Sequence, residues 1–125
     1  MASYVENNTS HGKSYIFDFG STVHVYSHEE MFNSLVAKED GTVKMVDGSA
    51  CEIIGTGTER DETVRALEAV RYVPETRYNV ISIRVLDEER CQIQVQQEIV
   101  TVSQGDGVLL NGEKCRRLYK IKIED

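Results

Sequence analysis

Short runs of apolar residues, many of them alternating with polar ones, recur along most of the chain, and this pattern predicts a mostly β fold. Several runs are rich in β-branched or aromatic side chains, which favour strands, and others alternate with a period of two, which gives a strand one apolar and one polar face. The predicted strands cover residues 15–17, 70–73, 79–83, 92–96, 99–102 and 118–123.

Two turn signals lie between predicted strands. Asp47-Gly48-Ser49 separates residues 43–46 from residues 51–54, the combination expected of an antiparallel hairpin with its turn at Asp47-Gly48. Asn111-Gly112 follows the apolar run 108–110 and predicts a second turn before the last strand.

Helical signals are scarce. Residues 28–36 are predicted to form a helix because Ser27 can cap its first turn, which contains Glu29 and Glu30. A shorter helical turn is predicted for residues 85–90. Together the elements predict a mostly β, closed, barrel-like domain with one or two short helices over residues 14–125, preceded by a disordered arm over residues 1–13.

Composition narrows the classes of partner and compartment. The chain has 125 residues, enough for one domain with its own core, and a net charge of -7. Nucleic acid is not expected as a partner, because phosphate binding needs clustered basic residues. Cys51, Cys91 and Cys115 form no paired motif, the N-terminus lacks a signal peptide, and no run is long enough to span a membrane. We therefore expect a cytoplasmic or nuclear protein without membrane contact.

The segment Tyr15-Ile-Phe-Asp18-Phe19-Gly20-Ser21 places an Asp and a Gly at the end of an apolar strand. Alone, this is an ordinary turn signal. Followed in order by VKMVDGSACEIIGTGT, LEAVRYVP, YNVIS and IVTVSQGDGVLLNGEKCRRLYKI, it resembles the protease segment of copia-type retrotransposon polyproteins, within the retropepsin family of aspartic proteases. The resemblance covers about residues 14–121 and implies a retropepsin-like β-barrel subunit.

The resemblance also implies roles for particular residues. Asp18 corresponds to the catalytic Asp and Gly20 to the glycine of its tight loop. The flap that closes over a peptide substrate corresponds to the hairpin at Val46, Asp47, Gly48 and Ser49, with Gly55-Thr56-Gly57 as a second candidate for its tip. Asn79, Val80 and Ile81 correspond to the apolar strand beside the catalytic loop and the substrate groove. Since each subunit supplies one Asp and the reaction needs two, one protonated and one ionised, activity implies a homodimer.

Phe19 departs from the family pattern. Active members have Ser or Thr there, whose hydroxyl joins the two catalytic loops, whereas phenylalanine has no hydrogen-bonding group and is much larger. Ser21 replaces a typical Ala, and its hydroxyl is expected to leave the loop in another direction. We therefore expect Asp18 to be a vestigial catalytic residue.

Two functional hypotheses follow. The first is a retrotransposon-derived, host-adopted domain that has lost proteolysis and binds a protein or peptide, as a homodimer or in a mixed dimer with a related protein. The alternative is an active homodimeric aspartic endopeptidase. The chain begins with Met1 and contains neither a zinc knuckle nor an integrase, so it is either a small gene product or an excised piece. No cofactor or metal is expected, although His24 and His28, four residues apart, leave a metal site as a less favoured alternative.

Overall fold

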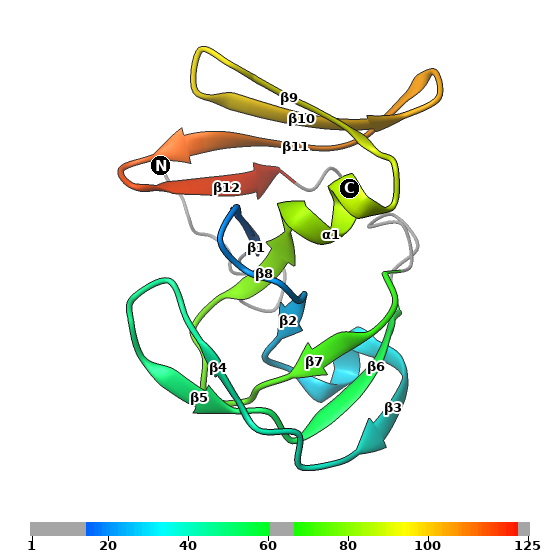
Figure 1. Cartoon of the computed structure of the whole chain (residues 1–125), viewed down its shortest axis with the longest axis vertical. Coiled ribbons are helices and arrows are strands. Elements are labelled where there is room, and N and C mark those ends of the chain that lie inside the picture. Colours follow the sequence, from blue (N-terminus) through cyan, green and yellow to red (C-terminus); the bar gives the residue numbers. More distant parts are fainter. Residues whose placement is uncertain (1–14, 61–66, 123–125) are drawn as a thin grey trace.

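The computed structural model of the protein describes residues 15–60 and 67–122, and these residues are mostly β-strand, as predicted (Figure 1). The arm predicted for residues 1–13 lies outside the described residues. None of the helices in the described part is long and apolar enough to cross a membrane.

Ten strands form one mixed sheet, and a separate hairpin lies against it. In the order in which they pair, the strands of the large sheet are β3 (Phe32–Ala37), β6 (Gly55–Glu59), β7 (Val70–Tyr72), β2 (Val25–Tyr26), β8 (Asn79–Ser82), β1 (Tyr15–Asp18), β12 (Leu118–Lys122), β11 (Gly107–Cys115), β10 (Ile99–Gln104) and β9 (Gln92–Gln96). The hairpin consists of β4 (Thr42–Lys44) and β5 (Ala50–Glu52), paired antiparallel as predicted from Asp47-Gly48.

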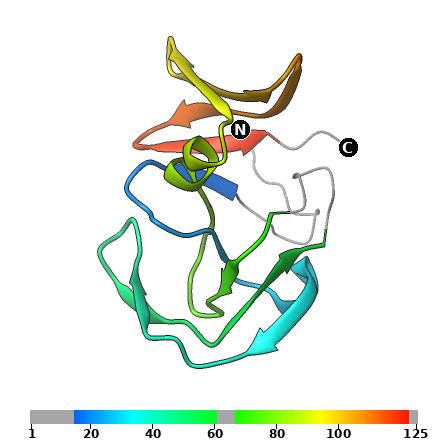
Figure 2. The same cartoon turned by 45° about the vertical axis from the view of Figure 1, so that its right-hand side comes forward.

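The closed barrel predicted from the sequence is wrong for the described residues. The sheet ends at β3 on one side and at β9 on the other, and these two strands do not pair. Strands β9 to β12 instead form an antiparallel meander that extends the sheet beyond β1 (Figures 1 and 2). In β9 only Ile93 is even half-buried and Val95 is 50% exposed, so no further strand covers the apolar side chains of this strand in the described part of the chain.

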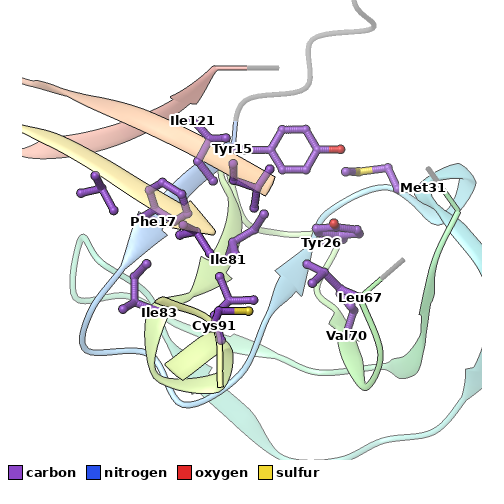
Figure 3. Packing of buried hydrophobic residues seen from close by; sticks show 14 of the residues in the cluster. Tyr15, Phe17, Tyr26, Met31, Leu67, Val70, Ile81, Ile83, Cys91 and Ile121 are labelled. Atoms are coloured by element: carbon purple, nitrogen blue, oxygen red, sulfur yellow. The ribbon is translucent and has the colours of Figure 1, made fainter. Parts of the chain in front are cut away.

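Two apolar clusters stabilise the fold, one on each side of β1. Tyr15 and Phe17 belong to the larger cluster, where they pack with side chains such as Tyr26 and Ile81 (Figure 3). Ile16, between them in sequence, belongs to the second cluster, because successive side chains of a strand point to opposite faces. The second cluster also contains Met45 and Cys51 from the hairpin and Ile53 from the segment after it. Its buried members are Ile16, Val25, Met45, Cys51, Ile53, Val73 and Val80.

The helix predicted for residues 28–36 is wrong except for one turn. A 3-10 helix covers Glu29–Met31, and the chain then continues as β3. Ser27 does not cap it, since its backbone and side chain both bond to Asn79. Asn33, Ser34 and Val36 have low helix propensity, and Ser34 and Val36 pair with β6 as part of a strand. The helical turn predicted for residues 85–90 corresponds to α1 (Ile83–Glu88), which begins earlier because Ser82 caps it.

The turn predicted at Asn111-Gly112 is also wrong. Strand β11 runs straight through these residues, and the chain turns at Gly105 and Asp106, where Gly105 has a φ of 62°. Gly112 is required for packing instead: a Cβ there would lie 2.9 Å from the Phe17 ring and 2.8 Å from the carbonyl oxygen of Lys120. Glycine is therefore present at position 112 because other groups of the sheet lie close to it, and not because the chain turns there.

Strand β6 was not predicted because its alternating residues are Gly and Thr instead of apolar side chains. It is an interior strand, paired with β3 on one side and β7 on the other, so Gly55-Thr56-Gly57, the second candidate for the flap tip, is not the tip of a hairpin. A Cβ at Gly57 would lie 1.9 Å from the carbonyl oxygen of Ser34. The two glycines therefore allow β3 to lie close to β6.

Replacing Gly57 by Ala is expected to lower the free energy of unfolding by about 1–3 kcal/mol or more, because the new methyl group overlaps backbone that must move. Urea unfolding followed by circular dichroism measures the change. Gly107→Ala is the control, since its Cβ would meet nothing closer than 3.9 Å, and it should change stability by no more than about 0.5 kcal/mol. Equal effects of the two substitutions would contradict the close approach of β3 to β6.

Candidate functional site: the Asp18 loop and the hairpin

The Asp18 loop, residues 18–24, connects β1 to β2 across the end of β8. Strand β8 lies between the two strands, parallel to β1 with Asp18 opposite Ser82, and antiparallel to β2 with Val80 opposite Val25. Strands β1 and β2 therefore do not pair with each other, and the loop has to pass over β8. Asp18 is partly buried at the start of this crossing.

Ser82 ties the loop to β8 and α1. Its hydroxyl donates to the carbonyl oxygen of Ser21 at 2.6 Å and accepts from the backbone N–H of Val85 at 3.1 Å, and its own N–H donates to Nδ1 of His24 at 2.9 Å. Ser82 and His24 are both almost completely buried. In a buried site such bonds are costly to break, so they fix where the loop starts its return to β2.

His24 therefore has a structural role, and it does not share a face with His28, which is exposed. Within the part of the chain that the structure describes, no group of three His, Cys, Asp or Glu side chains is placed to hold a metal ion. The described residues thus give no support to the alternative of a metal site at the two histidines.

Asp18 closes the first turn of the loop. Its Oδ1 accepts a hydrogen bond from the backbone N–H of Gly20 at 2.8 Å. This is the local bond that makes Asp a good turn residue. One chain brings one such carboxylate to this loop.

Phe19 points away from the buried network and lies against the meander. Its side chain is 43% exposed, and its ring meets the ring of Tyr119 in β12 edge to face, with the centroids 5.7 Å apart. Such aromatic pairs add to the energy of burial. Phe19 therefore attaches the loop to β12 within the same chain.

The hydroxyl of Ser21 bonds within the loop itself. It donates to the carbonyl oxygen of Val23 at 2.7 Å and accepts from the N–H of Val23 at 3.3 Å. These bonds direct the Ser21 side chain toward Val23, whereas the Phe19 ring lies against Tyr119. The hydroxyl is thus engaged within the loop.

The hairpin covers the face of the sheet to which Asp18 belongs. Asp18 is two residues after Ile16 in β1, so both lie on the same face, and Ile16 packs with Met45 and Cys51 of the hairpin region. In both overall views the tip of the hairpin and the Asp18 loop lie on the same side of the molecule (Figures 1 and 2). The loop and the hairpin therefore border one surface.

The hairpin tip is exposed and held by its own residues. Asp47 Oδ1 accepts from the Ser49 hydroxyl at 2.6 Å and from the Ser49 N–H at 2.9 Å, and Gly48 has a φ of 90°. The hydrogen bond from the Ser49 hydroxyl, and to a smaller extent the one from the Ser49 N–H, holds the pKa of Asp47 below its ordinary value. Val46 is 45% exposed at the tip and offers an apolar contact.

Asn79, Val80 and Ile81 lie behind the loop and have no exposed side-chain surface. Val80 and Ile81 fill the two apolar clusters, and the Asn79 Oδ1 accepts from the N–H and the hydroxyl of Ser27. In the single chain these residues therefore support the loop and β2. The pairing of β1 and β8 places their strand beside the Asp18 loop, and burial keeps their side chains out of any groove.

Sequence reasoning missed the polar residues that hold this region together. Ser82 was treated only as the end of a strand, although a Ser before a helix is a capping signal. The pair of Tyr26 and Glu59, whose buried side chains bond to each other, gave no signal because its members are 33 residues apart. Tyr119 likewise gave no sign of its contact with Phe19.

Ser82→Ala is expected to lower the free energy of unfolding by about 1–3 kcal/mol, because it leaves the Ser21 carbonyl and the Val85 N–H without their buried partner. Chemical denaturation measures this change. Ser34→Ala, which removes an exposed hydroxyl bond to Thr58, is the control and should cost well under that amount. No difference between the two variants would argue against the role assigned to Ser82.

The lowered pKa of Asp47 makes the hairpin tip sensitive to acid. Because the carboxylate form accepts the Ser49 bonds, they are present at neutral pH and are lost as the pH falls through the lowered pKa. Ser49→Ala should raise the midpoint of the Asp47 titration, followed by NMR of the carboxyl carbon. An unchanged midpoint would mean that the hydroxyl bond does not form in solution.

Comparison with known proteins gives one match. The family model of the Pol polyprotein beta-barrel domain matches residues 15–91, more than half of the chain and the whole span from β1 to the end of α1. Neither the curated proteins nor the solved structures contain a match to this sequence. The match includes the Asp18 loop, the hairpin and β8, and the chain therefore belongs to the family of Pol polyprotein beta-barrel domains.

Proposed function

We propose that this chain is a retropepsin-like domain of the copia type, adopted by its host, that has lost proteolysis and acts by binding a protein or peptide. Membership of the Pol family supports an origin in a polyprotein of retrotransposon type. The arrangement of β1, β8 and β2 supports the likeness to the protease, since the Asp of such an enzyme has to stand at a strand end on a rigid support.

The observation that carries the proposal is the position of the Phe19 side chain. In an active retropepsin the residue after the Asp holds the two catalytic loops in register through hydroxyl bonds. Here that residue is an aromatic ring packed on Tyr119 of its own chain. A loop that has lost this network does not hold two carboxylates in register, and a misplacement of about 1 Å can cost on the order of 100-fold in rate.

Ser21 supports the same conclusion. Its hydroxyl already donates to the Val23 carbonyl and accepts from the Val23 N–H, so it would have to give up both bonds to reach a second loop. The chemistry requires one protonated and one ionised carboxyl held a few ångströms apart. Neither Phe19 nor Ser21 offers a bond across the two loops that would hold them so.

The surface between the Asp18 loop and the hairpin supports a binding role. Val46 is 45% exposed at the hairpin tip, on the border of this surface, whereas the Phe19 ring lies against Tyr119 on the face of the larger cluster. Exposed apolar side chains with a polar surround are typical of protein contacts. We propose that this surface receives a protein or peptide, including a second copy of the chain or a related protein in a mixed dimer.

Cleavage of a diverse peptide library tests the loss of proteolysis. The native chain should cut no peptide between about pH 4 and pH 7, the range over which a coupled carboxyl pair titrates. Phe19→Ser should restore cleavage, because it returns a hydroxyl to the loop and removes the ring from Tyr119. Mass spectrometry of the products provides the measurement.

Asp18→Asn is the control, alone and combined with Phe19→Ser, and it should abolish any cleavage that depends on the carboxyl. Cutting by the native chain that disappears in Asp18→Asn would show an active homodimeric aspartic endopeptidase and overturn the proposal. A Phe19→Ser variant that folds and dimerises without cutting would show that residue 19 is not what silences the site.

A further inference from the structure

A second surface, the edge groove, lies along β3, at one end of the large sheet. It encloses about 470 Å³. Four of its residues come from β3, and the others come from the 3-10 helix, the segment before β6 and β7: Phe32, Asn33, Leu35, Ala37, Glu29, Ile54 and Tyr72. Leu35 and Tyr72 pack against the larger apolar cluster, whereas the hairpin next to the Asp18 loop covers the second one. The groove is therefore separate from the surface at Asp18.

The glycines of β6 help to form the groove. Gly55 lies opposite Ala37 on one side and Tyr72 on the other, and Gly57 lies opposite Leu35. Residues directly opposite each other in a sheet share a face. The strand between β3 and β7 thus has no side chain on this face at either position, and the larger neighbours form walls on both sides of it.

The backbone of β3 that faces away from β6 can form hydrogen bonds with another strand. The N–H of Lys38 donates to the carbonyl of Ile54, so even-numbered residues of β3 direct their backbone groups toward β6. Leu35 and Ala37 therefore direct theirs away from the sheet, whereas the bulge between Phe32 and Ser34 interrupts the alternation at Asn33. The described residues place no strand there, because β3 is the end of the sheet. An edge of this kind accepts an added strand.

Side chains of the same residues would contact that strand. Phe32 and Tyr72 form an aromatic pair with centroids 5.8 Å apart and an interplanar angle of 71°, and Ile54 is 36% exposed beside them. An aliphatic side chain of an added strand would be received between these rings and Leu35. The groove thus combines backbone pairing with one apolar recess, the combination that peptide-binding sheet edges use.

The charge beside the groove selects the flanking residues of a ligand. Glu29 is part of the lining of the groove. Burial, and to a smaller extent the negative charges of Glu29 and Glu30, raises the pKa of Tyr72. The neighbouring cation Arg71 faces Asp40, with 3.8 Å between Nε and Oδ2. The end of the groove near Glu29 therefore favours a Lys or Arg, in a chain whose net charge is -7.

We propose that the edge groove binds an extended peptide segment of a partner protein, which adds to β3 as a strand, inserts an aliphatic side chain between Phe32, Leu35 and Tyr72, and places a basic residue beside Glu29. The inference rests on the proposed binding role of the domain but assigns it a different surface. A basic and aliphatic segment of alternating pattern is the ligand chemistry that fits.

A fluorescein-labelled peptide, Lys-Thr-Leu-Thr-Leu-Thr-Lys, tests the proposal by fluorescence polarisation and by NMR of the labelled protein. The peptide should bind the native chain and shift the amide signals of Leu35 and Ala37. Glu29→Gln with Glu30→Gln should weaken binding about 3–10-fold, as expected for two exposed charges. Ala37→Trp, at an exposed position of the groove, should weaken it by about 10-fold or more by filling the space.

Val36→Thr is the matched control, because Val36 is 69% exposed on the opposite face of the same strand, and it should leave binding unchanged. A peptide with Glu in place of both Lys residues should bind more weakly, and one with a central Pro should not bind, since Pro cannot complete the strand pairing. Equal affinity of the native chain and the Ala37→Trp variant would overturn the proposal.

Two further outcomes separate this proposal from the proposed function. Amide shifts confined to Gly20 and Gly48 would place the peptide at the Asp18 surface and overturn the edge groove while supporting the broader binding role. No binding up to about 1 mM would also overturn the edge groove, whereas the loss of proteolysis is tested independently by the cleavage assay with Phe19→Ser.

Discussion

The burial of β8 between β1 and β2 is the constraint on which the rest of the structure depends. All four residues of β8 are buried, and its two apolar side chains fill opposite clusters. Since the strand occupies the space between β1 and β2, the Asp18 loop must cross its end, and Ser82 provides the hydrogen bonds that hold the crossing in place. The position of Asp18 thus follows from packing in the interior instead of from the loop's own sequence.

Local patterns in the sequence were sufficient for the elements that depend on local chemistry. The hairpin at Asp47-Gly48 was predicted because a turn residue and two apolar segments identify it without reference to the rest of the chain. Strand β6 and Gly112 show the limit of such patterns: in both, glycine is present because another backbone or a ring lies close by, and that neighbour is distant in sequence. The open sheet was missed for the same reason, because closure depends on which edges meet.

The candidate site was predictable only in part. The Asp18 segment was found from its resemblance to a protease loop, and Phe19 was identified as its departure. The contact of Phe19 with Tyr119, 100 residues further along, was outside the reach of any local pattern. The same contact links the matched Pol domain to the meander that follows it, since Tyr119 belongs to β12 and the family match ends at residue 91. The C-terminal strands therefore take part in shaping the loop.

In the sheet formed by residues 15–60 and 67–122, β3 and β9 are the end strands, and neither contains a charged residue. Natural sheets commonly protect such strands with Lys, Pro or a covering element, because exposed backbone groups pair readily with other chains. The net charge of -7 opposes such pairing through mutual repulsion between copies. Acidification or high salt removes that repulsion first, so the colloidal stability of this protein should fail before its fold does.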